Sequence, residues 1–162
     1  MEHRFALTPD QEEAANRIVQ RVIAALPEGP RPWIGGDCKV YVIDGDALIR
    51  TSWFVIGSHP GNLRQQYDEQ SIEQATRLAS NWQNMSSAES ESRDDAKRAG
   101  AIRGNLGPCR IFSFAGLSQF GNEAAMLFLA REVGDLDEKE AFAIAVTSGN
   151  EVYVSLAGVP AV

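Results

Sequence analysis

Apolar residues that recur at every third or fourth position predict a helix near the start of the chain. Thr8, Pro9 and Gln11 mark its beginning, because a threonine N-cap, a proline in the first turn and a glutamine three positions after the cap are typical of a capping box. A proline and a glycine follow the last apolar position. We therefore expect an amphipathic helix over residues 8–26, whose buried face holds Ala15, Ile18, Val19, Val22, Ile23 and Leu26.

Two runs of β-branched and aromatic residues, 38–43 and 47–56, predict a β-hairpin. A two-residue turn that begins at Gly45 places Cys38 opposite Trp53. Because side chains alternate along a strand, one face of the hairpin is then expected to hold Cys38, Val40, Val42, Ile49, Thr51, Trp53 and Val55.

The middle of the chain predicts two helices and a strand, separated by polar segments. Residues 86–98 are almost entirely polar and form either a solvated continuation of the preceding helix or a mobile linker, of which we favour the linker. Residues 109–114 predict a strand, and 135–140 an acidic loop or single turn. Apolar residues from 124 to 130 cover every side of the later helix, which should therefore be central. The earlier helix is expected to align Ile72, Ala75, Leu78, Trp82 and Met85.

Residues 141–147 and 151–157 also alternate, and they predict a second hairpin around a three-residue turn at 148–150. Taken together, these elements predict a single globular domain over 1–162, of the α/β (α+β) class. We expect one mixed sheet of about five strands, including two β-hairpins, with about three helices packed on it.

Composition supports a soluble protein. The 162 residues suffice for one core, and the hydrophobic and charged fractions of 44% and 23% are ordinary for globular domains. No apolar segment resembles a signal peptide or approaches the roughly 20 residues that span a bilayer. The two cysteines lack Cys-x-x-Cys spacing, and we expect them to be reduced thiols. We therefore expect a cytoplasmic protein without membrane contact.

The net charge of -7 argues against nucleic acid as a partner, because the 15 basic residues are scattered and the chain repels phosphates. A basic protein partner would instead be attracted. The acidic segment near the carboxyl end of the central helix offers candidate contacts, which are Glu132, Asp135, Asp137 and Glu138.

A strand-borne Cys38 and a His59 beyond the hairpin resemble the arrangement in the chemotaxis glutamine deamidases and related toxin deamidases, where a thiolate and an imidazole face each other across adjacent strands. The resemblance implies a thiol enzyme with Cys38 and His59 as its catalytic pair. The alternative is a buried thiol and a turn histidine, because His59 lies six residues beyond Trp53, the residue expected opposite Cys38.

The helix at 121–130 resembles the one that opens with His-x-Glu in zinc deaminases. Gly121 stands where the histidine ligand would be, and 158–160 contain no cysteine, so we expect neither a metal nor a cofactor. Glu123 remains as a candidate acid, or as a carboxylate that stabilises the start of the helix.

Aromatic residues offer a candidate ligand pocket, formed by Trp33, Trp53, Trp82 and Tyr41, although aromatics at such spacing also build cores. The leading hypothesis is an accessory, inhibitor or immunity-like domain that binds another protein and has no catalytic chemistry of its own. A small-molecule sensor using the aromatic pocket and a thiol enzyme are the alternatives.

Overall fold

One sheet lies between two layers of helices in the computed structural model, which describes residues 5–26, 35–57, 61–90 and 97–158. In chain order the elements are α1 (Pro9–Ala25), β1 (Gly35–Asp44), β2 (Ala47–Gly57), η2 (Gly61–Leu63), α2 (Arg64–Ser80), η3 (Ser87–Ser90), β3 (Ala101–Arg103), β4 (Arg110–Ala115), α3 (Gln119–Glu132), α4 (Glu138–Ser148) and α5 (Glu151–Ala157).

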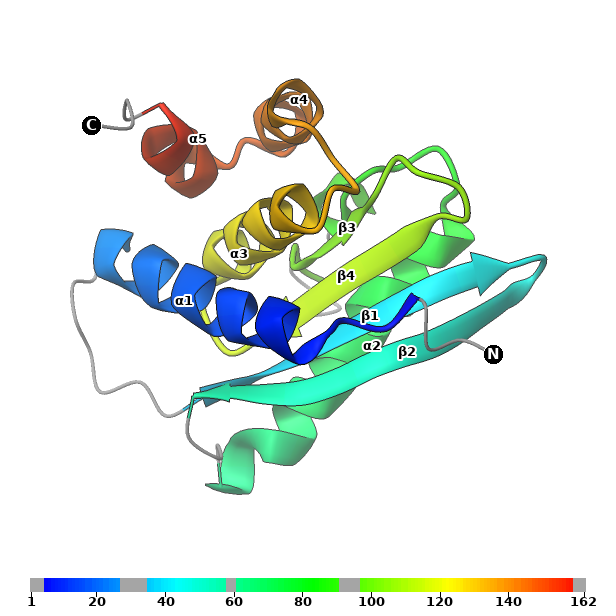
Figure 1. Ribbon diagram of the computed structural model, residues 1–162, viewed down its shortest axis with the longest axis horizontal. Helices are drawn as coiled ribbons and strands as arrows, with labels where there is room; N and C mark the ends of the chain where they lie inside the picture. Colours follow the sequence, from blue (N-terminus) through cyan, green and yellow to red (C-terminus); the bar gives the residue numbers. More distant parts are fainter. Residues whose placement is uncertain (1–4, 27–34, 58–60, 91–96, 159–162) are drawn as a thin grey trace.

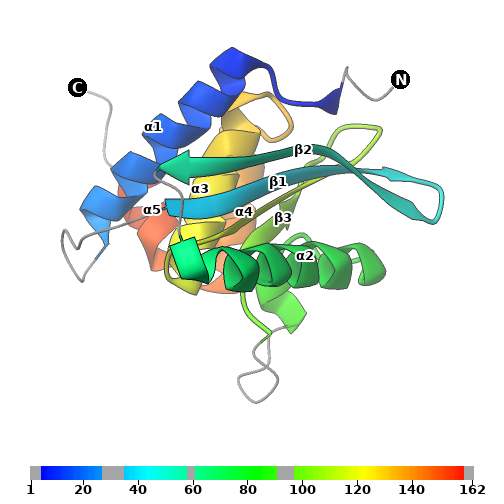
Figure 2. The ribbon, with the colours of Figure 1, turned by 90° about the horizontal axis from the view of Figure 1, so that it is seen from below.

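Within these residues the sheet has four strands in the order β2, β1, β4, β3, and every neighbouring pair is antiparallel. The helix α2 covers one face of the sheet, here called the α2 face (Figure 2). The helices α1 and α3 cover the other face, here called the core face, and α4 and α5 pack outside α3 (Figure 1). The fold is α+β.

The first helix and the first turn are confirmed. Thr8 caps α1, and its side chain and that of Gln11 form the reciprocal capping box. The strands β1 and β2 are joined by the two-residue turn that begins at Gly45, whose φ of 61° suits glycine. Local sequence therefore determines both features.

A β-bulge in β2 was not predicted. Val40 pairs with Ser52 whereas the next residue, Tyr41, pairs with Arg50, which leaves Thr51 as an extra residue. The Thr51 hydroxyl donates to the Val40 carbonyl at 3.2 Å, which fixes the bulge to β1. From Ser52 to the end of β2, each side chain therefore lies on the face of the sheet opposite to the one predicted.

Because of this shift, Cys38 lies opposite Phe54 rather than Trp53. Phe54 packs into the core with Cys38, whereas Trp53 pairs with Lys39 and contacts Asp37 on the α2 face. The prediction that Trp53 shares a face with Cys38 is therefore wrong.

The central helix α3 is confirmed. Ser118 caps it, and the Ser118 hydroxyl accepts a hydrogen bond from the Gly121 amide. The apolar run from 124 to 130 is buried as predicted, and the preceding Gly121, Asn122 and Glu123 are buried as well. The helix rests on β4 with α1 beside it (Figure 1).

The buried face of α2 differs in part from the prediction. Ala75 and Leu78 are buried as expected, together with the polar Ser71 and Gln74. Ile72 is 39% exposed, and α2 ends at Ser80, before Trp82, which is 76% exposed. Gln74 is accommodated inside because it donates to the Ala99 carbonyl and accepts from the Ser113 hydroxyl.

The predicted hairpin over 141–157 is wrong, because this segment forms α4 and α5. Asp137 caps α4 in a capping box with Glu140, Gly149 ends it in the left-handed conformation, and Asn150 caps α5. In the described part of the chain, the sheet therefore has four strands rather than five and is antiparallel rather than mixed, and there are five α-helices rather than three. The second hairpin of the sheet is β3–β4.

Gly36 provides a test of the close packing between β1 and β4. A Cβ at this position would lie 2.5 Å from both the Ala115 carbonyl oxygen and Cζ of Phe114. We expect Gly36→Ala to lower the free energy of unfolding by about 2–4 kcal/mol. Gly45→Asn is the control, because the turn is open and asparagine tolerates its backbone, so the change should stay within about 1 kcal/mol. Equal urea midpoints for the two variants would contradict this packing.

Candidate functional site

Cys38 is fully buried in the core, between Phe54 on β2 and Phe114 on β4. Burial raises the pKa of its thiol far above the ordinary value, and the neighbouring Lys39 charge only partly offsets this. The thiol is therefore protonated at neutral pH, whereas nucleophilic catalysis needs the thiolate. His59 lies outside the described residues, so the Cys38–His59 pair stays a prediction.

Lys39 is buried on the α2 face among acidic and hydroxyl groups. Its Nζ lies 2.9 Å from Oδ1 of Asp68 and donates to Oγ of Ser71 at 2.6 Å. Oδ2 of Asp37 lies 4.0 Å away, and the other oxygen of that carboxylate accepts from Nε1 of Trp53 at 2.7 Å. These contacts join β1 to α2 and position the indole of Trp53.

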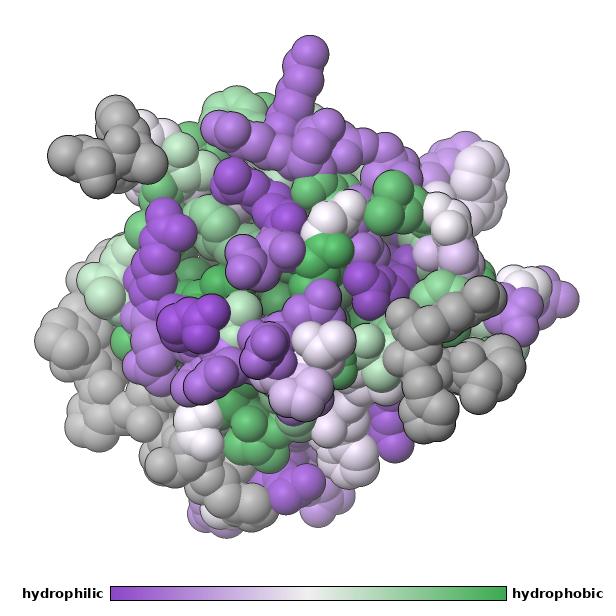
Figure 3. Space-filling view, in the orientation of Figure 1, coloured by the Kyte–Doolittle hydropathy of each residue, from purple (hydrophilic) through white to green (hydrophobic). Residues whose placement is uncertain are grey.

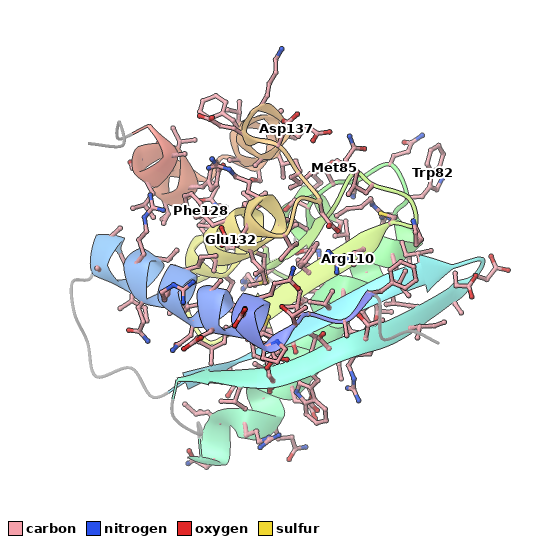
Figure 4. All side chains as sticks on the ribbon, in the orientation of Figure 1. Trp82, Met85, Arg110, Phe128, Glu132 and Asp137 are labelled. Carbon is pink, nitrogen blue, oxygen red and sulfur yellow. The ribbon has the colours of Figure 1, made fainter. Side chains whose placement is uncertain are left out.

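The predicted aromatic pocket is not assembled by the residues described. Trp53 is 43% exposed at the N-terminal end of α2, where the guanidinium groups of Arg50 and Arg64 lie over its ring. Trp82 follows the other end of this 17-residue helix, about 25 Å away, and projects from the molecule (Figure 4). Tyr41 is buried, and desolvation raises its pKa to about 12. Trp33 lies outside the described residues.

The four predicted acidic contacts have different roles. Both oxygens of Asp135 accept from the guanidinium of Arg110, at 2.8 and 2.6 Å, and Asp135 is only 4% exposed. Asp137 caps α4 but remains exposed, as do Glu132 and Glu138. Figure 4 shows Glu132 on α3 and Asp137 at the start of α4. Asp135 is thus already paired within the chain, and three exposed carboxylates remain for a partner.

Glu123 is fully buried and joins three segments. One carboxylate oxygen accepts from the Ser86 hydroxyl at 2.5 Å, and the other accepts from the Ser148 hydroxyl at 2.9 Å and the Asn150 amide at 2.8 Å. Burial raises the pKa of Glu123, although these three donors oppose the shift. Its neighbours thus connect α3 to the α4–α5 junction, which is a structural role.

An open groove of about 650 Å³ lies between the C-terminal half of β2 and the first half of α1. The helix side carries two carboxylates, and the strand side is apolar. Figure 3 shows hydrophobic residues reaching the surface below the hydrophilic residues of α1. The groove is lined by Pro9, Glu12, Glu13, Asn16, Phe54, Val55, Ile56 and Gly57.

The strand that borders this groove is an edge of the sheet. Among the described residues, β2 has β1 as its one strand neighbour. The opposite edge is β3, a three-residue strand that is itself covered, since Ser86 pairs with Ile102 and the Arg103 amide donates to the Met85 carbonyl. The groove and the open edge of β2 together form the candidate site.

Comparison of the chain with protein-family models, curated proteins and solved structures found no match in any of the three. None of the described helices has both the length and the apolar character needed to cross a membrane. In the same part of the chain, no cluster of three or more His, Cys, Asp or Glu side chains is placed to hold a metal ion.

The sequence did not identify the residues of the groove as a candidate site. Glu12 and Glu13 belong to the polar face of a predicted surface helix, where charges are ordinary. The one sequence feature that indicates the groove is the run from Trp53 to Ile56, which has four large apolar residues in succession and no charge. Only the strand order shows that this run lies at an edge.

We expect Asp135→Asn to lower the free energy of unfolding by about 2–4 kcal/mol, because it leaves the largely buried Arg110 guanidinium without its bidentate partner. Asp137→Asn should change it by no more than about 0.5 kcal/mol, since asparagine caps a helix as well as aspartate does. Urea unfolding of both variants measures the difference. Similar losses would contradict the assigned roles.

The raised pKa of Glu123 predicts a pH-dependent stability. The native state retains this proton at pH values where the unfolded chain has released it, so the free energy of unfolding should fall as pH rises from the unfolded pKa to the folded pKa. Glu123→Gln should abolish this part of the decline, as measured by urea unfolding from about pH 4 to about pH 8.

Glu123→Ala is the matched structural variant. It should cost about 2–4 kcal/mol at about pH 4, because the Ser86 hydroxyl and the Asn150 amide would lose their buried partner, and the difference from wild type should narrow as pH rises. A pH profile that is the same in wild type and Glu123→Gln would show that this carboxyl does not titrate in the range.

Proposed function

We propose that this chain is a protein-binding domain whose partner presents basic and apolar side chains to the groove between α1 and β2. The observation that carries the proposal is the composition of the groove. Its described lining residues include Glu12 and Glu13 but no lysine or arginine, and its strand side is formed by Phe54, Val55 and Ile56.

The energetics favour a polypeptide that combines both kinds of side chain. Burying the apolar strand side removes hydrocarbon from water, at about 25 cal/mol per Å². The carboxylates at the rim attract cations and accelerate encounter, and the net charge of -7 acts in the same direction. A lysine or arginine suits both demands, because its aliphatic stem covers apolar surface while its charged end reaches a carboxylate.

The groove suits a polypeptide better than a small molecule. Ligand pockets usually enclose most of the ligand surface, whereas this groove is open to solvent. The sensor hypothesis relied on four aromatic residues, and of the described members Trp82 lies beyond the far end of α2 from Trp53, while Tyr41 is buried. The thiol-enzyme hypothesis relied on Cys38, which is buried on the core face.

Site-specific photocrosslinking in cells of the source organism tests the proposal. A photoreactive phenylalanine analogue at Asn16, on the groove, should trap a protein in a defined stoichiometric complex. The same analogue at Ala24, an exposed position near the other end of α1, should not. Crosslinks of equal yield at both positions would contradict the groove as the site, and a bound small molecule without a protein complex would favour the sensor.

Charge reversal provides the quantitative measurement. Glu13→Lys should weaken the isolated complex by about 3- to 10-fold and reduce its sensitivity to salt. Glu151→Lys is the matched control, because it reverses another exposed glutamate near the start of a helix but outside the groove. If both variants weakened binding equally, a general charge effect would explain the result and the groove would not.

A further inference from the structure

We propose that the bound segment of the partner is an extended strand that pairs through its backbone with the outer edge of β2. This inference rests on the proposed function and specifies the conformation of the partner. It starts from the sheet order, in which the 11-residue β2 has β1 on one side and no described strand on the other. An edge strand offers a row of backbone donors and acceptors to a further strand.

Within the described residues, the exposed part of β2 lacks the usual protection of an edge. Natural edge strands are commonly blocked by charged residues, prolines or bulges. The bulge of β2 lies at Thr51, and the charged Arg50 precedes it. Both protective features therefore lie before the part of β2 that lines the groove. From residue 52 to 57 the sequence is SWFVIG, which contains neither a charge nor a proline. A regular apolar edge of this kind is stabilised by a strand that covers it.

The two faces of β2 determine which side chains the added strand should carry. On the core face, Phe54 and Ile56 lie next to the acidic rim of the groove formed by Glu12 and Glu13. On the α2 face, Trp53 is 43% exposed. A strand placed about 4.8 Å beyond β2 would direct alternate side chains to these two faces.

The partner strand should therefore alternate basic and apolar residues. Basic side chains on the core face would reach the rim carboxylates while their stems cover Phe54. Apolar side chains on the α2 face would cover the part of the Trp53 ring that the guanidinium groups of Arg50 and Arg64 leave exposed. A second copy of this chain is the competing occupant, and it would supply another apolar β2 edge and the same acidic rim, so charge complementarity favours the basic strand.

The probe is a synthetic peptide of about eight residues that alternates lysine and valine, long enough to pair along the groove. Two derivatives carry N-methyl groups, one on all lysine amides and the other on all valine amides. In an extended strand, the amides of alternate residues point to opposite edges, so one derivative blocks the edge that faces β2 and the other blocks the outer edge. The two derivatives are matched in composition and differ only in which edge is blocked.

Strand addition predicts that one derivative binds at least about 10-fold more weakly than the parent peptide, while the other stays within about 3-fold. Fluorescence anisotropy of a labelled peptide measures this. If both derivatives bind like the parent, or both weaken equally, backbone pairing is wrong. Loss of binding of the parent with Glu13→Lys would in that case still support the groove, which keeps the two proposals distinguishable.

Two further measurements, made on the protein rather than on the peptide, test whether the peptide binds at the edge of β2. Hydrogen exchange at the outward amides of 53–57 should slow on peptide binding, and exchange in β3 should not. Trp53→Ala should weaken binding of the peptide by about 5- to 10-fold, whereas Trp82→Ala, which removes the other exposed tryptophan among the described residues, should have no effect. Unchanged exchange in β2 would overturn strand addition.

The parent peptide is titrated to about 1 mM, where even a weak specific complex is populated. Absence of binding at that concentration overturns the inference. Concentration-dependent protection of β2 amides without any peptide, together with a dimer in native mass spectrometry, would also overturn it and assign the edge to a second copy of the chain.

Discussion

The extra residue in β2 is the constraint on which the candidate site depends. Side chains alternate along a strand, so one inserted residue reverses the face reached by every later side chain. With the bulge at Thr51, Phe54 and Ile56 enter the core face and Trp53 reaches the α2 face. The Thr51 hydroxyl also lies 3.1 Å from the Phe5 carbonyl oxygen, to which it can donate, so the bulge is linked to the segment that precedes α1. The bulge at Thr51 therefore helps to position both β2 and the segment that leads into α1, which form the two sides of the groove.

Three sets of buried polar contacts connect the layers around this hairpin. Lys39 joins β1 to α2 through Asp68, and the pair of Arg110 and Asp135 joins β4 to the loop after α3. Glu123 joins α3 to the α4–α5 junction. Polar contacts of this kind are directional, and breaking one leaves a buried group unsatisfied, so they specify a particular arrangement more strongly than apolar packing does. The groove rests on these layers, because α1 packs on α3 and β2 pairs with β1.

The acidic composition of the chain serves both structure and the proposed recognition. Asp135 is used within the fold, because its carboxylate is occupied by a guanidinium, whereas Glu12 and Glu13 face a groove. Acidic residues of this chain thus have different roles. The open edge of β2 gives the groove carboxylates a functional context, since a basic strand would satisfy the backbone of the edge and the charges of the rim together.

The sequence by itself determined the elements whose signals are local. The capping box of α1, the turn at Gly45, the strand β4 and the apolar run of α3 were all predictable, because each depends on residues within one element. The caps of α4 and α5 were also present in the sequence. They were outweighed by an alternating apolar pattern that fits either a strand or a short helix, since Phe142, Ile144 and Val146 satisfy the period of a strand over so few residues.

Only the tertiary structure decided the face reached by Trp53, the pairing of Asp135 and the exposure of the β2 edge. Each of these depends on contacts between residues far apart in the chain. The bulge forms where β1 and β2 pair, Arg110 approaches Asp135 from another element, and an edge exists only once the order of strands is set. The candidate site could not be recognised from the sequence, because its acidic side comes from α1 and its apolar side from β2, and these two elements share no local pattern.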